Sequence, residues 1–188
     1  MIHAIDTAYN GRKYRSRLEA RWAVFFDAMN TKHVYEPEGY NLAGSGWART
    51  DGLNTLYLPD FWLPNLRIYV EVKPFGARSP FRRTTHASAL AAFPLPLVAV
   101  FGEPGLCQIV EYGDLGCCDL GQLGQCTACG ALRYGYRCAG IFTGTPCQCR
   151  HSDEFITQAP KLDAAVAAAL SARFEHGEHP EIAHRRSF

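Results

Sequence analysis

The chain has 188 residues, of which 47% are hydrophobic and 20% charged, and its formal net charge is +1. This composition is typical of a soluble globular domain, and the lack of overall basic character means that any polyanion must be held by local patches. No stretch reaches the roughly 18 apolar residues of a membrane span, and the N-terminus lacks the apolar core of a secretory signal. We therefore expect a cytoplasmic protein whose eight cysteines stay reduced, which favours metal binding over disulfides.

The amino-acid composition of the chain changes twice along its length. Residues 1–113 mix apolar, aromatic and charged residues, as a folded core does. Residues 114–155 contain seven of the eight cysteines, and residues 156–188 form a polar tail around an alanine-rich helix expected at about 160–174. The chain is therefore predicted to hold a core domain, a small cysteine-rich module and a C-terminal helix with its tail.

The first expected helix spans about 14–29. Its apolar residues recur with a 3.6-residue period, which is typical of a helix packed on a core. They are Leu18, Trp22, Phe25, Phe26 and Met29. Glu19 is one step of about 100° from Leu18, so it lies at the margin of the buried stripe, where a carboxylate can face a cleft. Arg15, Arg17 and Arg21 form either a solvated helix face or a set of phosphate contacts.

The residues after this helix, about 33–112, predict a small sheet. Strands are expected at about 33–36, 57–63, 68–73, 96–104 and 106–112, with a helix at 81–92. Side chains alternate along a strand, so Ile68, Val70 and Val72 should point into the core. Glu71 and Lys73 then share the opposite face. The core is thus expected to run helix, three strands, helix, strand.

Asp60 is expected opposite Glu71. If Asn65 and Leu66 are the central turn residues, the antiparallel register pairs the two carboxylates, although a slip by one or two residues stays open. Facing carboxylates repel, and in a half-buried site they need a compensating cation. A hard ion such as Mg²⁺ or Mn²⁺ accepts carboxylates together with water and phosphate oxygens. Lys73 is then placed to orient a nucleophile or to stabilise developing negative charge.

Pro59-Asp60, followed after ten residues by Glu71-Val72-Lys73, resembles the signature of the PD-(D/E)XK nuclease superfamily. The helix that carries Glu19 resembles its first motif. The segments SRLEARWAVFFD, YEPEGYNL, YLPDFWLP and YVEVKP are most similar to phage and mobile-element nucleases, and to the endonuclease subunit of cut-and-paste transposition machinery. The resemblance covers about residues 8–105. It implies an α/β fold with a restriction-endonuclease-like core and a mixed sheet.

The resemblance also implies roles for individual residues. Asp60 and Glu71 would bind the divalent metal, with the backbone carbonyl of Val72 as a further ligand. Lys73 would assist the nucleophile, and Glu19 would support the metal. Together these are the expected catalytic residues.

Many members of the superfamily carry a Gln or a basic residue on the second helix. No Gln is present at 81–92, and Arg82, Arg83 or His86 are the candidates to replace it. The expected DNA contacts are Arg15, Arg17, Arg82 and Arg83.

Cysteine spacing predicts a structural Zn²⁺ site in a zinc-ribbon-like β module. Cys126-Thr-Ala-Cys129-Gly has the C-x2-C spacing of a zinc knuckle, and a second pair should follow a hairpin. The expected ligands are Cys126, Cys129, Cys147 and Cys149. The second pair is C-x-C rather than C-x2-C, so Cys138 or His151 stays open as a replacement. Reduced cysteines packed in a small core are the alternative.

These features predict a divalent-metal-dependent endonuclease that hydrolyses DNA phosphodiester bonds, encoded by a phage or mobile element and nucleoid-associated in a bacterial host. One alternative is a non-catalytic DNA-binding or adaptor protein on the same scaffold. Another is a nuclease that acts only with a partner protein in a larger assembly. Cutting both strands would favour a homodimer, with one site per strand.

Overall fold

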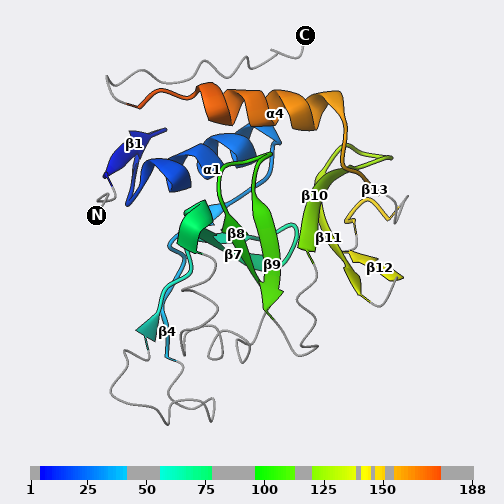
Figure 1. Cartoon of the computed structure of the whole chain (residues 1–188), viewed down its shortest axis with the longest axis horizontal. Coiled ribbons are helices and arrows are strands. Elements are labelled where there is room, and N and C mark those ends of the chain that lie inside the picture. Colours follow the sequence, from blue (N-terminus) through cyan, green and yellow to red (C-terminus); the bar gives the residue numbers. More distant parts are fainter. Residues whose placement is uncertain are drawn as a thin grey trace.

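The computed structural model describes residues 5–41, 56–77, 96–112, 120–138, 141–144, 147–150 and 155–174. Within these ranges the fold is mixed α/β, with two α-helices on one face of a large mixed sheet (Figure 1). None of the helices in these ranges is long and apolar enough to cross a membrane.

The described elements follow in chain order. They are β1 (Thr7–Tyr9), β2 (Arg12–Tyr14), α1 (Arg17–Ala28), β3 (Val34–Tyr35), β4 (Tyr40–Asn41), β5 (Leu56–Tyr57), β6 (Phe61–Leu63), β7 (Ile68–Lys73), the 3-10 turn η2 (Phe75–Ala77), β8 (Leu97–Phe101), β9 (Gln108–Tyr112), β10 (Leu120–Cys126), β11 (Leu132–Cys138), β12 (Ile141–Gly144), β13 (Phe155–Ile156) and α4 (Pro160–Ser171).

One sheet joins most of the strands, in the order β12-β11-β10-β9-β8-β7-β6-β3, with β13 paired to β10. β7 and β8 run parallel, and the other pairs along this path are antiparallel. The ribbons β1–β2 and β4–β5 form separate two-stranded sheets. Because β9 pairs with β10, the sheet of the core continues into the cysteine-rich segment.

The hairpin of β6 and β7 has the predicted register. Phe61 pairs with Val70 and Leu63 with Ile68, so residues 64–67 form the turn. Arg67 has a φ of 54°, and its N–H donates to Leu63 O at 2.8 Å, which closes the turn. Continuing the register by one residue sets position 60 opposite position 71, as the sequence predicted.

Helix α1 covers this hairpin with its apolar stripe. Trp22, Phe25 and Phe26 are at most 1% exposed, and Phe26 packs edge-on against Phe61 of β6 at 5.4 Å between ring centroids. The helix begins at Arg17 rather than near residue 14, because β2 ends at Tyr14 and pairs with β1.

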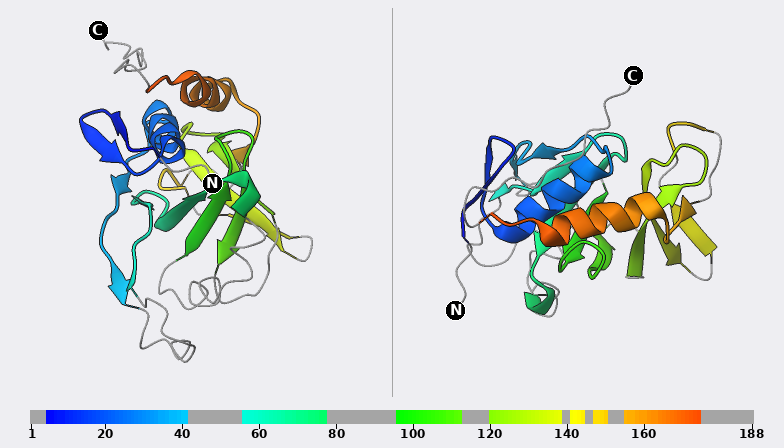
Figure 2. Two further views of the ribbon diagram at one scale, coloured as in Figure 1. Left: turned by 60° about the vertical axis from the view of Figure 1, so that its left-hand side comes forward. Right: turned by 90° about the horizontal axis from the view of Figure 1, so that it is seen from above.

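Helix α4 lies beside α1 on the same face of the sheet (Figure 2). Pro160 stands in its first turn, where a missing N–H breaks no helical hydrogen bond. Leu162, Ala165 and Ala169 form its buried face, and small alanine side chains allow the two helices to approach closely. The predicted C-terminal helix is thus confirmed, with its end at Ser171.

The strand expected at 57–63 is wrong as one element. Tyr57 belongs to β5 and pairs with Tyr40 of β4, whereas β6 starts only at Phe61. Pro59 has no N–H to continue a strand ladder. The chain therefore passes at Pro59 from the β4–β5 sheet to the sheet that contains β6. The helix expected at 81–92, with Arg82, Arg83 and His86, lies outside the described residues.

Candidate functional site

Asp60 directly precedes β6 and is almost wholly buried, at 1% exposure. Its Oδ2 accepts a hydrogen bond from the backbone N–H of Val72 at 2.7 Å, which ties the carboxylate to β7. Its Oδ1 accepts from the Arg15 guanidinium at 2.6 Å. Both oxygens are therefore held by donors from neighbouring segments.

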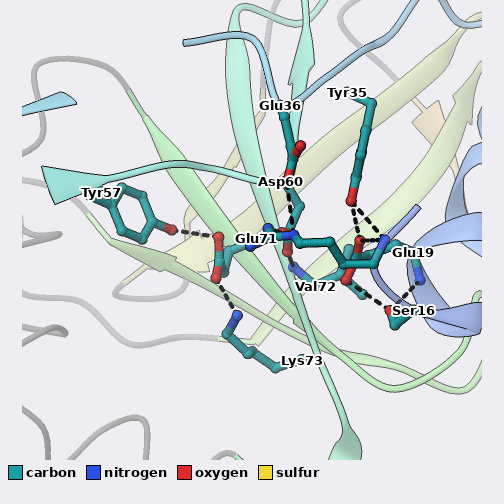
Figure 3. A network of polar contacts seen from close by, with 10 residues as sticks. Ser16, Glu19, Tyr35, Glu36, Tyr57, Asp60, Glu71, Val72 and Lys73 are labelled. Atoms are coloured by element: carbon teal, nitrogen blue, oxygen red, sulfur yellow. Dashed lines mark hydrogen bonds and ion pairs between the residues drawn. The ribbon is translucent and has the colours of Figure 1, made fainter. Parts of the chain in front are cut away.

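Glu71 projects from β7 beside Asp60 and is 5% exposed (Figure 3). Its Oε2 accepts from the Tyr57 hydroxyl at 2.6 Å, and its Oε1 accepts from Lys73 Nζ. Glu71 and Lys73 share one strand face, as alternation predicted. The sequence indicated no role for Tyr57; its only signal was an aromatic residue just before the Pro59-Asp60 pair.

The electrostatics of the pair favour an added positive charge. Burial, followed by the charge of Glu71, raises the pKa of Asp60 to about 8, although Lys73 and the Val72 N–H oppose the rise. Burial on its own would lower the pKa of Lys73, but the Glu71 and Asp60 carboxylates outweigh it and raise that pKa. Lys73 therefore stays an ammonium at neutral pH, and its side chain keeps 30% exposure.

Glu19 has a local task that the sequence reading missed. Ser16 is the N-cap of α1: its Oγ accepts from the Glu19 N–H at 3.1 Å and donates to Glu19 Oε1 at 2.8 Å. Glu19 Oε2 accepts from the Arg15 N–H at 3.1 Å and from the Tyr35 hydroxyl at 2.5 Å. The spacing S-x-x-E before an apolar run is the capping-box signal, and it was visible in the sequence.

Figure 3 shows Glu19 with Ser16 and Tyr35 on one side of Asp60, and Glu71 with Lys73 on the other. Within the part of the chain that the structure describes, the only group of three or more potential metal ligands is formed by cysteines. The three carboxylates of the sequence prediction therefore do not gather as one cluster, although the charge of Glu19 contributes to the raised pKa of Asp60.

Arg15 bridges two acids, Asp60 and Glu36. Besides Asp60, its Nε pairs with Glu36 Oε1 at 2.7 Å, while its side chain keeps 55% exposure. Glu36 has a φ of 45°, which ends β3 at Tyr35 and turns the chain toward Arg15. Arg17 is half-buried in the first turn of α1.

The donor set of this site fits a hard divalent cation. Asp60 and Glu71 offer carboxylate oxygens, the ligand type that Mg²⁺ and Mn²⁺ prefer, and Val72 stands between Glu71 and Lys73 with its N–H on Asp60. Two cations of the chain, Arg15 and Lys73, already pair with these carboxylates. A cation would have to displace donors from the oxygens it takes.

A separate four-cysteine cluster can hold a structural metal ion such as Zn²⁺. The Sγ atoms of Cys126, Cys129, Cys147 and Cys149 all lie within 4.8 Å of one another. Cys126 and Cys149 are 3.8 Å apart, and Cys129 and Cys147 3.4 Å. Tetrahedral Zn²⁺ with bonds of about 2.3 Å places its sulfurs about 3.8 Å apart. The predicted ligand set is thus brought together; His151 lies outside the described residues.

Local backbone geometry shapes the first cysteine pair. Gly130 has a φ of 69° and donates its N–H to Cys126 O at 3.0 Å, which closes the first knuckle. Backbone N–H groups of Cys129 and Ala128 outweigh the effect of burial and lower the pKa of Cys126 to about 6, toward the thiolate that a metal binds. Within the second pair, between Cys147 and Cys149, Gln148 donates to Asn65 O at 3.2 Å, so the cluster touches the β6–β7 turn.

Comparison with protein-family models, with curated proteins and with solved structures gives no significant match.

Proposed function

We propose that the protein is a divalent-metal-dependent endonuclease that hydrolyses DNA phosphodiester bonds. The observation that carries the proposal is the pair of buried carboxylates, Asp60 just before β6 and Glu71 on the adjacent β7, with Lys73 on the face of Glu71. A purely structural strand would gain nothing from burying two acids side by side, because each loses hydration and repels the other.

Each side chain has a task in this proposal. Asp60 and Glu71, with the Val72 carbonyl, would hold Mg²⁺ or Mn²⁺, which supplies positive charge opposite the phosphoryl oxygens when bound. Lys73 remains protonated, so it donates hydrogen bonds and charge to the reacting phosphate and does not take a proton from water. Tyr57 holds the carboxylate of Glu71 in place through its hydroxyl.

Glu19 enters the proposal through the helix cap. Its carboxylate fixes the start of α1 and the backbone of Arg15, and Arg15 in turn reaches Asp60. Glu19→Gln distinguishes this capping role from a direct role in supporting the metal. A glutamine can accept from Arg15 N–H and Tyr35 and donate to Ser16, so the cap survives the change, whereas a metal-supporting charge is lost.

The test has two arms that do not depend on each other. Mn²⁺ binding to the zinc-loaded chain is followed by electron paramagnetic resonance, and nicking or cutting of supercoiled, linear, single-stranded and branched DNA is followed with and without Mg²⁺. We expect Asp60→Asn to abolish both, and Lys73→Gln to abolish cleavage while Mn²⁺ still binds. The matched control is Asp6→Asn, since Asp6 is exposed and pairs with Lys13, and neither contacts Asp60 or Glu71 in the described residues. Equal cleavage by Asp60→Asn and the parent chain would end the proposal.

A second candidate is a non-catalytic DNA-binding or adaptor protein on the same scaffold. It is favoured by one observation: all four oxygens of Asp60 and Glu71 already accept from donors of the chain itself. In that case DNA binds without cleavage, and Mg²⁺ and Asp60→Asn change nothing. Mn²⁺ binding without cleavage would instead point to a nuclease that needs a partner protein.

A further inference from the structure

A polar cavity lies at the C-terminal end of α1, the end opposite to the helix cap and the carboxylate pair. Its volume is about 420 Å³, which is within the range of ligand sites. Segments from four parts of the chain line it: the β1–β2 ribbon, the last turn of α1, the residues before β3, and the turn between β6 and β7. Glu19 and Asp27 of the cavity are eight residues apart on α1, or about 12 Å along the helix axis.

Positive charge dominates this cavity. Arg12 and Lys32 are both exposed, and neither forms an ion pair within the ranges that the structure describes. The single acid of the lining, Asp27, already accepts from the Tyr9 hydroxyl at 3.0 Å. Asp27 also faces His33 Nδ1 at 3.6 Å. An anionic ligand would therefore meet two available cations and an acid that is engaged elsewhere.

His33 forms part of the cavity wall and reports on charge placed there. Its side chain is 11% exposed, and its ring packs against Phe26 and Phe61 at 5.6 and 5.8 Å between centroids. Nδ1 lies 3.3 Å from Thr31 O and 3.6 Å from Asp27 Oδ1, both acceptors, so Nδ1 carries the proton of the neutral ring. The ring can donate from Nε2 only after it takes up a second proton, which a bound anion favours. Burial lowers the pKa of His33, and the charge of Arg12 adds to this, whereas Asp27 and Thr31 O oppose it.

Carboxamides complete the lining. Asn10 and Asn30 occupy left-handed turns, with φ of 48° and 53°, and Asn65 lies in the β6–β7 turn. Amide side chains can donate to phosphate oxygens while charged side chains supply the attraction. An apolar ligand, by contrast, would leave these polar groups without partners.

We propose that this cavity binds the phosphoryl oxyanion of a phosphate ester, with Arg12 and Lys32 as charged contacts and the His33 ring beside them. The same chemistry is offered by a nucleotide in solution and by a phosphate of a DNA strand. The site goes beyond the proposed hydrolysis and does not require it. A purely structural reading, in which the cations only complement the C-terminal end of α1, predicts no ligand at all.

The experiment uses the full zinc-loaded chain without Mg²⁺, so that no cleavage can occur. Imidazole nitrogen signals are followed by NMR over a pH series, with the His33 signal assigned from its loss in His33→Gln. The probes are inorganic phosphate, deoxyadenosine monophosphate and a short single-stranded oligonucleotide. An oxyanion beside His33 is expected to raise its pKa by about 1 unit.

Arg12→Gln and Lys32→Gln are each expected to weaken binding of the effective probe about tenfold. For the oligonucleotide, each should also lower the slope of log affinity against log salt by about 0.7. Both side chains are exposed, so these variants should fold. The matched control is Lys13→Gln, which removes the same charge from β2 but at a side chain that is 73% exposed and paired with Asp6.

Saturation by the oligonucleotide at lower concentration than by the small probes assigns the site to a DNA strand. Saturation by phosphate or the mononucleotide alone assigns it to a nucleotide in solution, and either result supports the site. The proposal is overturned if no probe moves the His33 signal, or if Lys13→Gln weakens binding as much as Arg12→Gln.

Discussion

Without a divalent cation, the buried carboxylate pair should make the fold sensitive to pH, and Asp60→Asn should remove that sensitivity. Asparagine keeps an oxygen for the Val72 N–H, which lies 2.7 Å from Asp60, so the tie to β7 survives. Asparagine cannot ionise, so no second negative charge is buried beside Glu71. The substitution therefore isolates the electrostatic cost of the pair.

The sign follows from where the proton is bound. In the unfolded chain Asp60 ionises near its ordinary pKa of 3.8, whereas in the fold its pKa is about 8 because of burial and Glu71. Between these values the folded state holds the extra proton. Stability is then fully present below about pH 4 and is lost progressively as the pH rises to about 8.

At about 1.4 kcal/mol per pKa unit, the whole difference corresponds to at most about 6 kcal/mol. Glu71 shares the same environment and can take part of the proton, which reduces the measurable effect. We expect the free energy of unfolding of the parent chain to fall by about 3 kcal/mol from about pH 5 to about pH 9, and that of Asp60→Asn to stay nearly level.

Urea unfolding followed by the fluorescence of the chain, which includes the fully buried Trp22, measures this difference. Buffers are freed of divalent ions by resin rather than by a soluble chelator, which would strip zinc from the cysteine cluster. Asp6→Asn, an exposed acid, serves as control. Parallel pH profiles for Asp60→Asn and the parent chain would show that the carboxylate pair is not strained by burial. Adding Mn²⁺ should restore the lost stability in the parent chain only.

Three further predictions concern the scaffold. Cys129→Ser should abolish stoichiometric zinc binding and lower the unfolding midpoint, whereas Cys107→Ser, outside the cluster, should retain the metal. Mass spectrometry measures the zinc content, and equal zinc in both variants would show that Cys129 is not a ligand. Ser16→Ala should cost about 1 kcal/mol in urea unfolding through loss of the α1 N-cap, and an unchanged midpoint would mean that the cap is dispensable. Gly121→Ala should cost about 1–3 kcal/mol, because its Cβ would collide with the buried ring of Tyr134; a neutral result would show that this ring can shift.

Much of the carboxylate site was predictable because it depends on local rules. Alternation along β7 places Glu71 and Lys73 on one face, and a four-residue turn sets the register that brings Asp60 opposite Glu71. The cysteine set was predictable for a similar reason, since short spacing within each pair limits how far two thiols can separate.

Other features depend on contacts between distant segments. No sequence pattern near Tyr57 predicts that β5 is separate from β6 and pairs with β4. Nor does any pattern predict that the Tyr57 hydroxyl donates to Glu71. Arg15 looked like a helix residue because it belongs to a basic run, yet β2 and the cap hold it outside α1 and direct it to Asp60. Glu19 was predicted to support a metal, whereas its contacts show that its oxygens face the helix cap.

The pairing of β9 with β10 bears on any attempt to shorten the chain. Strand β8, next to β9, is apolar throughout and fully covered, and β10 supplies the neighbour on the far side of β9. A fragment ending after β9 would leave that strand with unpaired N–H and C=O groups along an open margin, which invites pairing with another copy. Such a fragment should self-associate into aggregates, so the cysteine-rich segment protects the core sheet whatever else it binds.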